Sequence, residues 1–185
     1  INADHLSILV SYDNLEMVKF LYQLNNKIDF NHNDSYILKL SITLQFDSIT
    51  YWLLNNIMNL DLHVQDNLLF KTACMNNNLQ LLKTLYNYSD KIDFSEYNQF
   101  YLNIAIYYET PYLFKWIYFV IKNISPDKLD QQIYIKNSIY HNNLFILKFL
   151  LSEYPDFDIN FDNGYIMRIC FGNNSNCKKF ALIFS

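Results

Sequence analysis

The sequence is poor in the residues that turn or loosen a chain, with 2 glycines and 3 prolines among 185 residues. Gly-rich phosphate loops and long disordered segments need far more of them, so neither is expected. Gly164 and Gly172 form no phosphate-binding motif. Arginine is nearly absent as well: Arg168 is the only one, and the formal net charge is −4. Because nucleic-acid-binding surfaces normally carry a basic excess, we expect no nucleic-acid partner.

Cysteine is scarce and its spacing is uninformative for metal binding. Cys74, Cys170 and Cys177 form no C-x-x-C pair and leave one residue unmatched, which favours a reducing, intracellular compartment. The longest apolar stretch, 112–121, contains Lys115 and is too short to span a bilayer, so we expect no membrane insertion.

Aromatic and aliphatic residues are abundant. Tyr and Phe occur 16 and 15 times, and 51% of the chain is hydrophobic, which is enough for a sizeable core. The excess of Asn, Ile, Tyr, Phe and Lys is typical of an AT-rich coding genome. A single Asn or Tyr therefore carries little information, whereas a pattern that recurs does.

Two such patterns recur with a common period along the chain. The first is an apolar–Asp–apolar triplet, found at 28–30, 60–62, 92–94 and 157–159, with a decayed copy at 124–126. The second is a Lys-aromatic-Leu type segment, found at 19–22, 51–54, 83–86, 115–118, 148–151 and 179–182. Because both patterns share the same extra residue in the fifth unit, they indicate internal repeats.

Each unit has the pattern of two short helices. The second helix follows a residue that caps well, at Asn14, Asn78, Thr110 and Asn143, and Pro111 suits a first helical position. The first helix is expected to be shorter, as at 68–75 and 100–107, and carries a small inner residue at Ser41, Ala73, Ala105 and Ser138. Asp34, Asp66, Asn98, Asp130 and Asn163 precede it as turn or cap residues.

A pair of short helices cannot bury its apolar face alone, but stacked pairs can. We therefore expect an all-α solenoid of paired helices with extended or hairpin connectors. It forms one repeat domain over 1–185, with about five full units and a shorter sixth. Since the first residue is Ile1 rather than Met, the chain is interpreted as a piece of a longer array.

These features resemble ankyrin repeats, whose period is about 33 residues. The resemblance rests on the small inner residue, the segment from Asn78 to Tyr86 and the apolar–Asp–apolar triplet, and it covers almost the whole chain. The Thr-Pro-Leu-His segment of the family is absent. The glycine at its helix junction is replaced by Asp13, Gln45, Asn77, Glu109 and Asn142, of which Gln45 and Glu109 fit a left-handed backbone least well. The composition is similar to the divergent repeats of giant amoeba-infecting viruses, which implies a location in the host cytoplasm or with the virus.

Catalytic, metal and cofactor sites are not expected. His32 and His63 lie about one repeat apart and could form a metal pair on neighbouring connectors, but no carboxylate or Cys recurs beside them. The repeated aspartates are interpreted as turn residues that bond nearby backbone N–H groups, and the repeated lysines as a solvated helix face. Cys74 and Cys170 are interpreted as small buried hydrophobes.

The resemblance implies a non-catalytic module that binds another protein through a concave face, formed by connectors and first-helix ends. Tyrosine supplies large, stiff contact area with one polar group, which suits an interface, although packing between repeats is the competing interpretation. The predicted partner-binding residues are Tyr12, His32, Asn33, Gln65, Met75, Ser95, Glu96, Tyr107, Tyr108, Tyr140 and His141.

The alternative function is structural. In that case the chain contacts copies of itself, or further repeats, through apolar end faces that no polar repeat covers. The sequence places these faces at 6–10 and 180–184.

Overall fold

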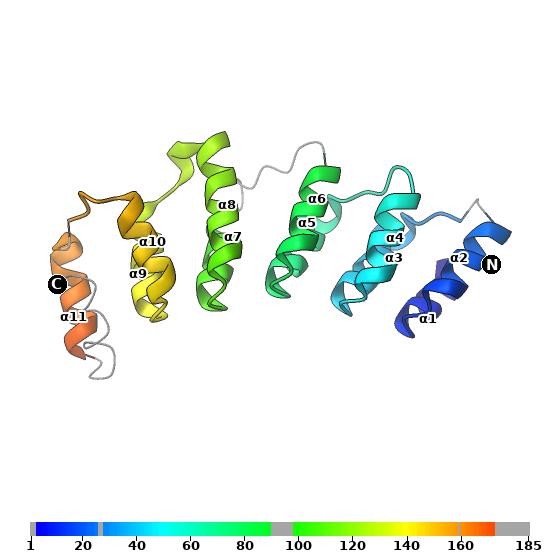
Figure 1. The fold of residues 1–185 in the computed structure, drawn as a ribbon, viewed down its shortest axis with the longest axis horizontal. Helices are drawn as coiled ribbons and strands as arrows, with labels where there is room; N and C mark the ends of the chain where they lie inside the picture. Colours follow the sequence, from blue (N-terminus) through cyan, green and yellow to red (C-terminus); the bar gives the residue numbers. More distant parts are fainter. Residues whose placement is uncertain (1–2, 26–27, 90–97, 159, 173–185) are drawn as a thin grey trace. The chain divides into compact units, whose positions relative to one another are not determined.

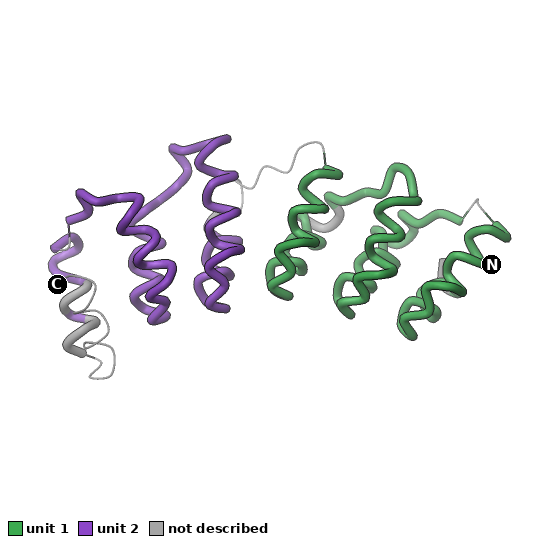
Figure 2. Tube along the Cα trace, in the orientation of Figure 1, with its two compact units in different colours: residues 1–92 green, residues 93–185 purple. Residues whose placement is uncertain are grey.

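The structure, a computed structural model, describes residues 3–25, 28–89, 98–158 and 160–172 (Figure 1). These residues form eleven α-helices and one short 3₁₀ turn, and no strand occurs among them. The all-α fold class is therefore confirmed. The chain divides into two compact units, residues 1–92 and residues 93–185, and each is described by itself (Figure 2). A single domain over 1–185 stays a prediction.

The first unit contains three helix pairs. The first helices of the pairs, α1, α3 and α5, pack against one another in chain order, and each also packs against the helix that follows it. The pairs are α1 (Ala3–Ser11) with α2 (Leu15–Leu24), α3 (His32–Thr43) with α4 (Asp47–Asn56), and α5 (Val64–Met75) with α6 (Leu79–Tyr88).

The second unit repeats this arrangement with two pairs and one further first helix. Here α9 packs between α7 and α11, and α8 packs against α10. Its elements are α7 (Asn98–Tyr107), α8 (Pro111–Ile124), the 3₁₀ turn η1 (Pro126–Lys128), α9 (Gln131–Tyr140), α10 (Leu144–Glu153) and α11 (Phe161–Gly172).

The second helices begin where the sequence predicts. The side chains of Asn14, Asn78 and Asn143 each accept a hydrogen bond from the backbone N–H three residues ahead, which satisfies one orphan donor of the helix. Pro111 occupies the first turn of α8, as expected. Thr110 is an exception, because its hydroxyl donates to the carbonyl of Ala105 at 3.3 Å instead of accepting a helix N–H.

The first helices differ from the prediction at their beginnings. By their bounds α3 and α5 have 12 residues, against 10 for α4 and α6, but their right-handed parts, 36–43 and 68–75, are shorter than α4 and α6, as predicted. Residues Asn33, Asp34 and Ser35 have φ near +55°, so regular right-handed helix begins only after this left-handed turn. Asn67 also has a positive φ, and the regular part of α5 therefore starts at Leu68, as the pattern predicts. Asp130 caps α9 by accepting from the Ile133 N–H.

The core consists of the same positions in every pair. In the first unit Leu6, Leu38 and Phe70 occupy equivalent positions in successive pairs, and all three are buried. Burying one such side chain contributes roughly 1.5–3 kcal/mol, so each added pair extends one hydrophobic layer. The small inner residues are buried as well, at Ser41, Ala73, Ala105 and Ser138. The Ser41 hydroxyl accepts a hydrogen bond of 2.8 Å from Thr50, which shows how closely α3 and α4 approach at this position.

The connectors follow the prediction for the repeated aspartates. Asp29, Asp61 and Asp158 each accept a hydrogen bond from the backbone N–H two residues ahead, at 2.8–2.9 Å. The equivalent Asp93 lies outside the described residues. These carboxylates therefore shape the chain locally and do not form an acid/base pair.

Candidate interaction surface

Every described first helix with a following partner ends in the same turn. The backbone N–H of the residue that caps the next helix donates a hydrogen bond to the carbonyl five residues before it. The N–H of the residue just before this cap donates to the carbonyl three residues before itself. This pair of hydrogen bonds is a Schellman motif. It supplies donors to backbone carbonyls that have no partner within the helix at its C-terminal end. The residues at the left-handed position of the motif are Asp13, Gln45, Asn77, Glu109 and Asn142, with φ between 52° and 60°.

All five junction residues thus adopt the left-handed backbone, including Gln45 and Glu109. This turn fixes the position of the residues at the end of each first helix, because its hydrogen bonds close the backbone there. The side chains there are presented at fixed places rather than on a loose loop.

In the second unit this turn displays four aromatic rings, which we call the aromatic cluster: Tyr107, Tyr108, Tyr140 and His141. The centre of the Tyr107 ring lies 5.0 Å from that of Tyr108 and 5.4 Å from that of His141. The ring centres of His141 and Tyr140 are 5.0 Å apart. All three contacts are edge-to-face. The three tyrosines are exposed around a half-buried His141, so the cluster is open to solvent although its rings support one another.

In the first unit the equivalent turns carry Tyr12, Leu44 and Met75, which are also exposed. Asn76 differs, because its side-chain amide donates to the carbonyl of Ile42 at 3.0 Å and joins α5 to α3. The first unit therefore shows single apolar side chains where the second unit shows a cluster.

Of the predicted connector residues, His32 and Asn33 have described side chains, and both belong to the first unit. His32 and Asn33 lie at the beginning of α3 and are exposed, whereas the aromatic cluster and its equivalents lie where first helices end. A ten-residue helix separates its two ends by about 15 Å, so connectors and helix ends are two distinct places on a pair. Gln65 belongs to α5 but its side chain is outside the described part, and Ser95 and Glu96 lie outside the described residues altogether.

Burial changes the pKa of several titratable side chains in the described residues. Burial raises the pKa of the Cys74 thiol far above its usual range, so the thiol stays protonated, as expected for a buried hydrophobe. Burial also raises the pKa of the Tyr134 phenol. Among the residues that the structure describes, no group of three or more His, Cys, Asp or Glu side chains could hold a metal ion.

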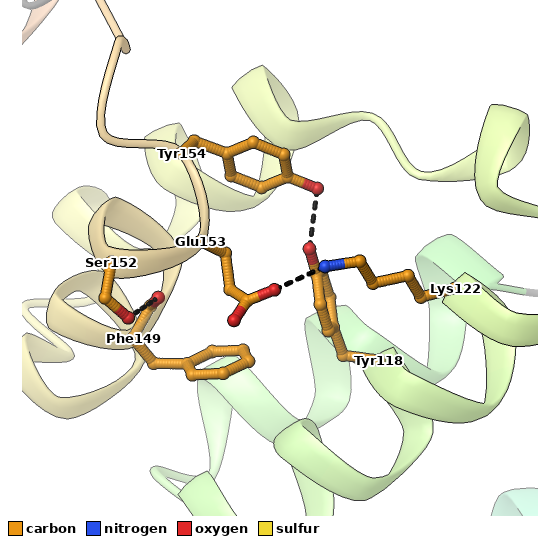
Figure 3. A network of polar contacts seen from close by, with 6 residues as sticks. All are labelled: Tyr118, Lys122, Phe149, Ser152, Glu153 and Tyr154. Atoms are coloured by element: carbon orange, nitrogen blue, oxygen red, sulfur yellow. Dashed lines mark hydrogen bonds and ion pairs between the residues drawn. The ribbon is translucent and has the colours of Figure 1, made fainter.

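A polar network joins α8 to the end of α10 (Figure 3). The Tyr118 and Tyr154 hydroxyls are 2.6 Å apart, and Lys122 donates to Glu153 at 2.6 Å. Burial, together with the neighbouring Tyr154 hydroxyl, raises the pKa of Tyr118. The phenol stays neutral at physiological pH, and we interpret the network as a connection between repeats.

Two open hollows lie beside connectors. One, of about 600 Å³, is lined by residues 127–132 and 156–158, including four aspartates and Lys128. Asp130 and Asp158 already accept backbone N–H groups there. The other, of about 520 Å³, is lined by residues 54–60 together with Leu62 and Tyr88. Each hollow lies within a single unit, and neither is lined by a residue of the aromatic cluster.

The sequence patterns missed the residues that join connectors. Asn31 donates to the carbonyl of Asn59 at 2.8 Å and accepts from the N–H of Asp61 at 2.9 Å, and Ser35 donates to the carbonyl of Asp61 at 3.1 Å. In the second unit the sequence patterns also missed a bond between helices, in which Asn137 on α9 donates to Asn103 on α7 at 2.7 Å. The only signal in the sequence was the repeat spacing between partners, which is weak in a chain so rich in asparagine.

Comparisons of the chain with family models, curated proteins and solved structures find no match. None of the described helices has the length and apolar character needed to cross a bilayer.

Proposed function

We propose that this chain is a non-catalytic, ankyrin-like solenoid that binds another protein through the ends of its first helices. The observation that carries the proposal is the aromatic cluster, in which three exposed tyrosines and His141 support one another. Aromatic side chains of this kind dominate interface energetics, because they bury much area and lose little conformational entropy on binding.

The ankyrin-like part of the proposal is supported by features that recur from pair to pair. Five junctions share the left-handed residue and the two bonds of the Schellman motif, and the small inner position is buried four times. Both features fit the resemblance seen in the sequence, where glycine and a small residue occupy the same positions of the family.

The binding part of the proposal is supported by how firmly the rings are held. Because Tyr107 and Tyr140 project from closed turns and both contact His141, little ordering is required when a partner covers them. The members of the cluster are all aromatic, and the exposed, charged Glu109 directly follows Tyr108 in the chain. Aromatic residues at the centre with charge at the rim are typical of protein interfaces.

The test compares two double variants in quantitative affinity capture from cell lysate. Tyr107→Ala/Tyr140→Ala removes two rings of the cluster, and Tyr112→Ala/Phe145→Ala removes two comparably exposed rings from the second helices of the same unit. Losing ~2 kcal/mol at a hot spot weakens binding about thirtyfold. We expect a partner that the parent chain and the control retain and the cluster variant loses.

Circular dichroism must show that both variants keep the helical content of the parent chain. Equal recovery of every captured protein by the cluster variant and the control contradicts the proposal.

A further inference from the structure

The apolar end faces that the sequence places at 6–10 and 180–184 do not supply an exposed surface in the described residues. Leu6 and Val10 are fully buried, because they belong to the layer in which α1 packs against α3. Residues 180–184 lie outside the described residues. A different surface with large exposed apolar side chains lies on the second helices of the second unit.

The helices α8 and α10 share this surface, which we call the outer surface. We define it by the exposed residues Tyr112, Lys115, Phe119, Phe145 and Lys148. Tyr112, Lys115 and Phe119 are separated by three and four residues on α8, which places them along one side of the helix. Phe145 and Lys148 occupy the positions on α10 equivalent to Tyr112 and Lys115, and α10 packs against α8.

The repeat shows that these positions face outward and that neighbouring pairs do not cover them. Ser48 on α4 is equivalent to Tyr112, and Asn55 is equivalent to Phe119. Both are exposed, although α3, the first helix of their pair, packs between α1 and α5. The exposure of the rings on the outer surface therefore does not depend on where a pair lies along the chain.

The two units differ in what they carry at these outward positions. In the first unit they are all polar, at Glu16, Ser48 and Gln80 and at Gln23, Asn55 and Asn87. In the second unit Tyr112 and Phe145 are 79% and 76% exposed at the first of these positions. Single exposed rings are common on protein surfaces, whereas rings that recur on adjacent helices form an apolar patch, and such patches mark binding sites.

The charge of the outer surface is opposite to that of the chain. The formal net charge of the chain is −4, yet α8 and α10 together carry three lysines and one glutamate. Lys122 donates to that glutamate, Glu153, so these two charges offset each other (Figure 3). No ion pair joins Lys115 or Lys148 to a carboxylate within the described part of the chain. Glu109 precedes α8 at the helix junction, so the outer surface itself presents positive charge beside aromatic rings.

This combination of residues favours an anionic lipid surface over a protein partner. Lysine is depleted from protein interfaces, whereas lysine together with Phe and Tyr is typical of helices that lie on anionic membranes. The Lys115 ammonium lies 5.0 Å from the centre of the Phe149 ring, so charge and rings occupy the same layer. The long apolar stem of lysine lets rings enter the headgroup region while the ammonium stays among the phosphates.

We propose that the outer surface docks on an anionic lipid bilayer. Tyr112, Phe119 and Phe145 enter the headgroup region, and Lys115 and Lys148 bind the anionic headgroups. The chain then lies on the bilayer, and no helix crosses it. This contact goes beyond the proposed protein-binding function and does not rest on it, because it uses second helices and the aromatic cluster lies at the ends of first helices.

Cosedimentation with lipid vesicles at physiological ionic strength tests the charge of the contact. We expect binding to vesicles of phosphatidylserine and phosphatidylcholine in equal parts, and little binding to phosphatidylcholine alone. Lys115→Gln/Lys148→Gln should weaken binding about thirtyfold, since each lysine at an anionic surface contributes about fivefold. Lys19→Gln/Lys83→Gln is the matched control, because it removes the same charge from equivalent positions of the first unit, and it should change binding less than about threefold.

A second pair of variants tests the rings. Tyr112→Ala/Phe145→Ala should weaken vesicle binding by at least about tenfold, because both rings lose their contact with the bilayer. Tyr107→Ala/Tyr140→Ala, which removes two exposed rings of the aromatic cluster from the same unit, should bind vesicles like the parent chain. Circular dichroism must show the parent's helical content in all variants. Protein capture should show the reverse pattern for these two variants, so the two proposals fail separately.

Several outcomes would overturn the proposal. One is the absence of binding to the mixed vesicles, and another is equal binding to phosphatidylcholine alone. Equal losses in the outer-surface variants and their controls would show that binding occurs elsewhere on the chain. Binding of single-stranded DNA or polyglutamate without binding of vesicles would identify an anionic polymer instead of a bilayer as the occupant.

Discussion

The hydroxyl of Tyr118 on α8 lies 2.6 Å from the hydroxyl of Tyr154 at the end of α10. Tyr118 is fully buried, while Tyr154 is half-buried. The hydrogen bond connects two helix pairs through residues about one repeat apart in the sequence. The buried Tyr118 hydroxyl depends on this bond for a partner more than the half-buried Tyr154 hydroxyl does, because the latter is nearer to water.

Removing either hydroxyl should therefore have unequal costs. Tyr154→Phe leaves the buried Tyr118 hydroxyl without this partner and should lower the free energy of unfolding by about 1–3 kcal/mol. Tyr118→Phe leaves the half-buried Tyr154 hydroxyl, which water can reach, and should lower the free energy of unfolding by about 0.5–1.5 kcal/mol. Urea unfolding of both variants measures the difference.

The double variant Tyr118→Phe/Tyr154→Phe provides the control. It should be more stable than Tyr154→Phe alone, because no buried hydroxyl of this pair remains unsatisfied. A cost of the double variant equal to the sum of the two single costs would show that the hydroxyls do not depend on each other.

Placing glycine at a helix junction should stabilise the chain. Gln45 and Glu109 adopt φ of 60° and 54°, which is unfavourable for side chains that bear a Cβ. Gln45→Gly and Glu109→Gly should each raise the free energy of unfolding by about 1 kcal/mol, after the added flexibility of the unfolded chain is counted.

The matched control is Gln80→Gly, an exposed position within α6. The backbone there is right-handed helix, in which glycine is unfavourable, so Gln80→Gly should lower the free energy of unfolding by about 1 kcal/mol. Thermal or urea unfolding measures all three variants, and destabilisation by all three would contradict the left-handed junctions.

Enlarging a small inner residue should be costly. Ala105 is completely buried, and its carbonyl closes the turn into α8, so Ala105→Leu would overfill the space. We expect a loss of about 1–3 kcal/mol in the free energy of unfolding. Ile104→Leu, one residue away on the half-buried side of α7, should change it by less than about 1 kcal/mol. Urea unfolding compares the two, and equal stability of both variants would show that the inner position has room to spare.

The ion pair between Lys136 and Asp162 predicts a pH dependence in the second unit. The two groups are 2.7 Å apart, and the hydrogen bond from Lys136 lowers the pKa of the Asp162 carboxyl. A pKa lowered by folding gives stability that is present above the unfolded pKa and is lost as pH falls through the folded value.

An NMR titration of the side-chain carboxyl should give Asp162 a pKa below the ordinary value of about 3.9. Lys136→Gln should return it toward that value and weaken the acid dependence of unfolding. Lys148→Gln serves as the control, because Lys148 is exposed on α10 and is not among the groups that shift the pKa of Asp162. An unchanged Asp162 pKa in Lys136→Gln would contradict this assignment.

Much of the local structure was determined by the sequence itself. The caps at Asn14, Asn78 and Asn143 and the aspartate turns are predictable, because each bond links atoms two or three residues apart. The positions of the helix junctions followed from the repeat period for the same reason. Even Gln45 and Glu109, whose residue types argue against it, follow their equivalents, since the closed turn fixes the backbone whatever side chain it carries.

Only the tertiary structure decided which aromatic residues serve the core and which remain available. Tyr134 and Tyr140 lie on the same helix in similar sequence surroundings, yet Tyr134 is buried and Tyr140 is exposed. Contacts such as Tyr118 with Tyr154 and Asn31 with Asp61 join residues about one repeat apart, and they depend on how one helix pair is rotated against the next. The spacing of the repeat contains no information about that rotation, because it arises from side-chain packing across the interface and not from bonds within a turn.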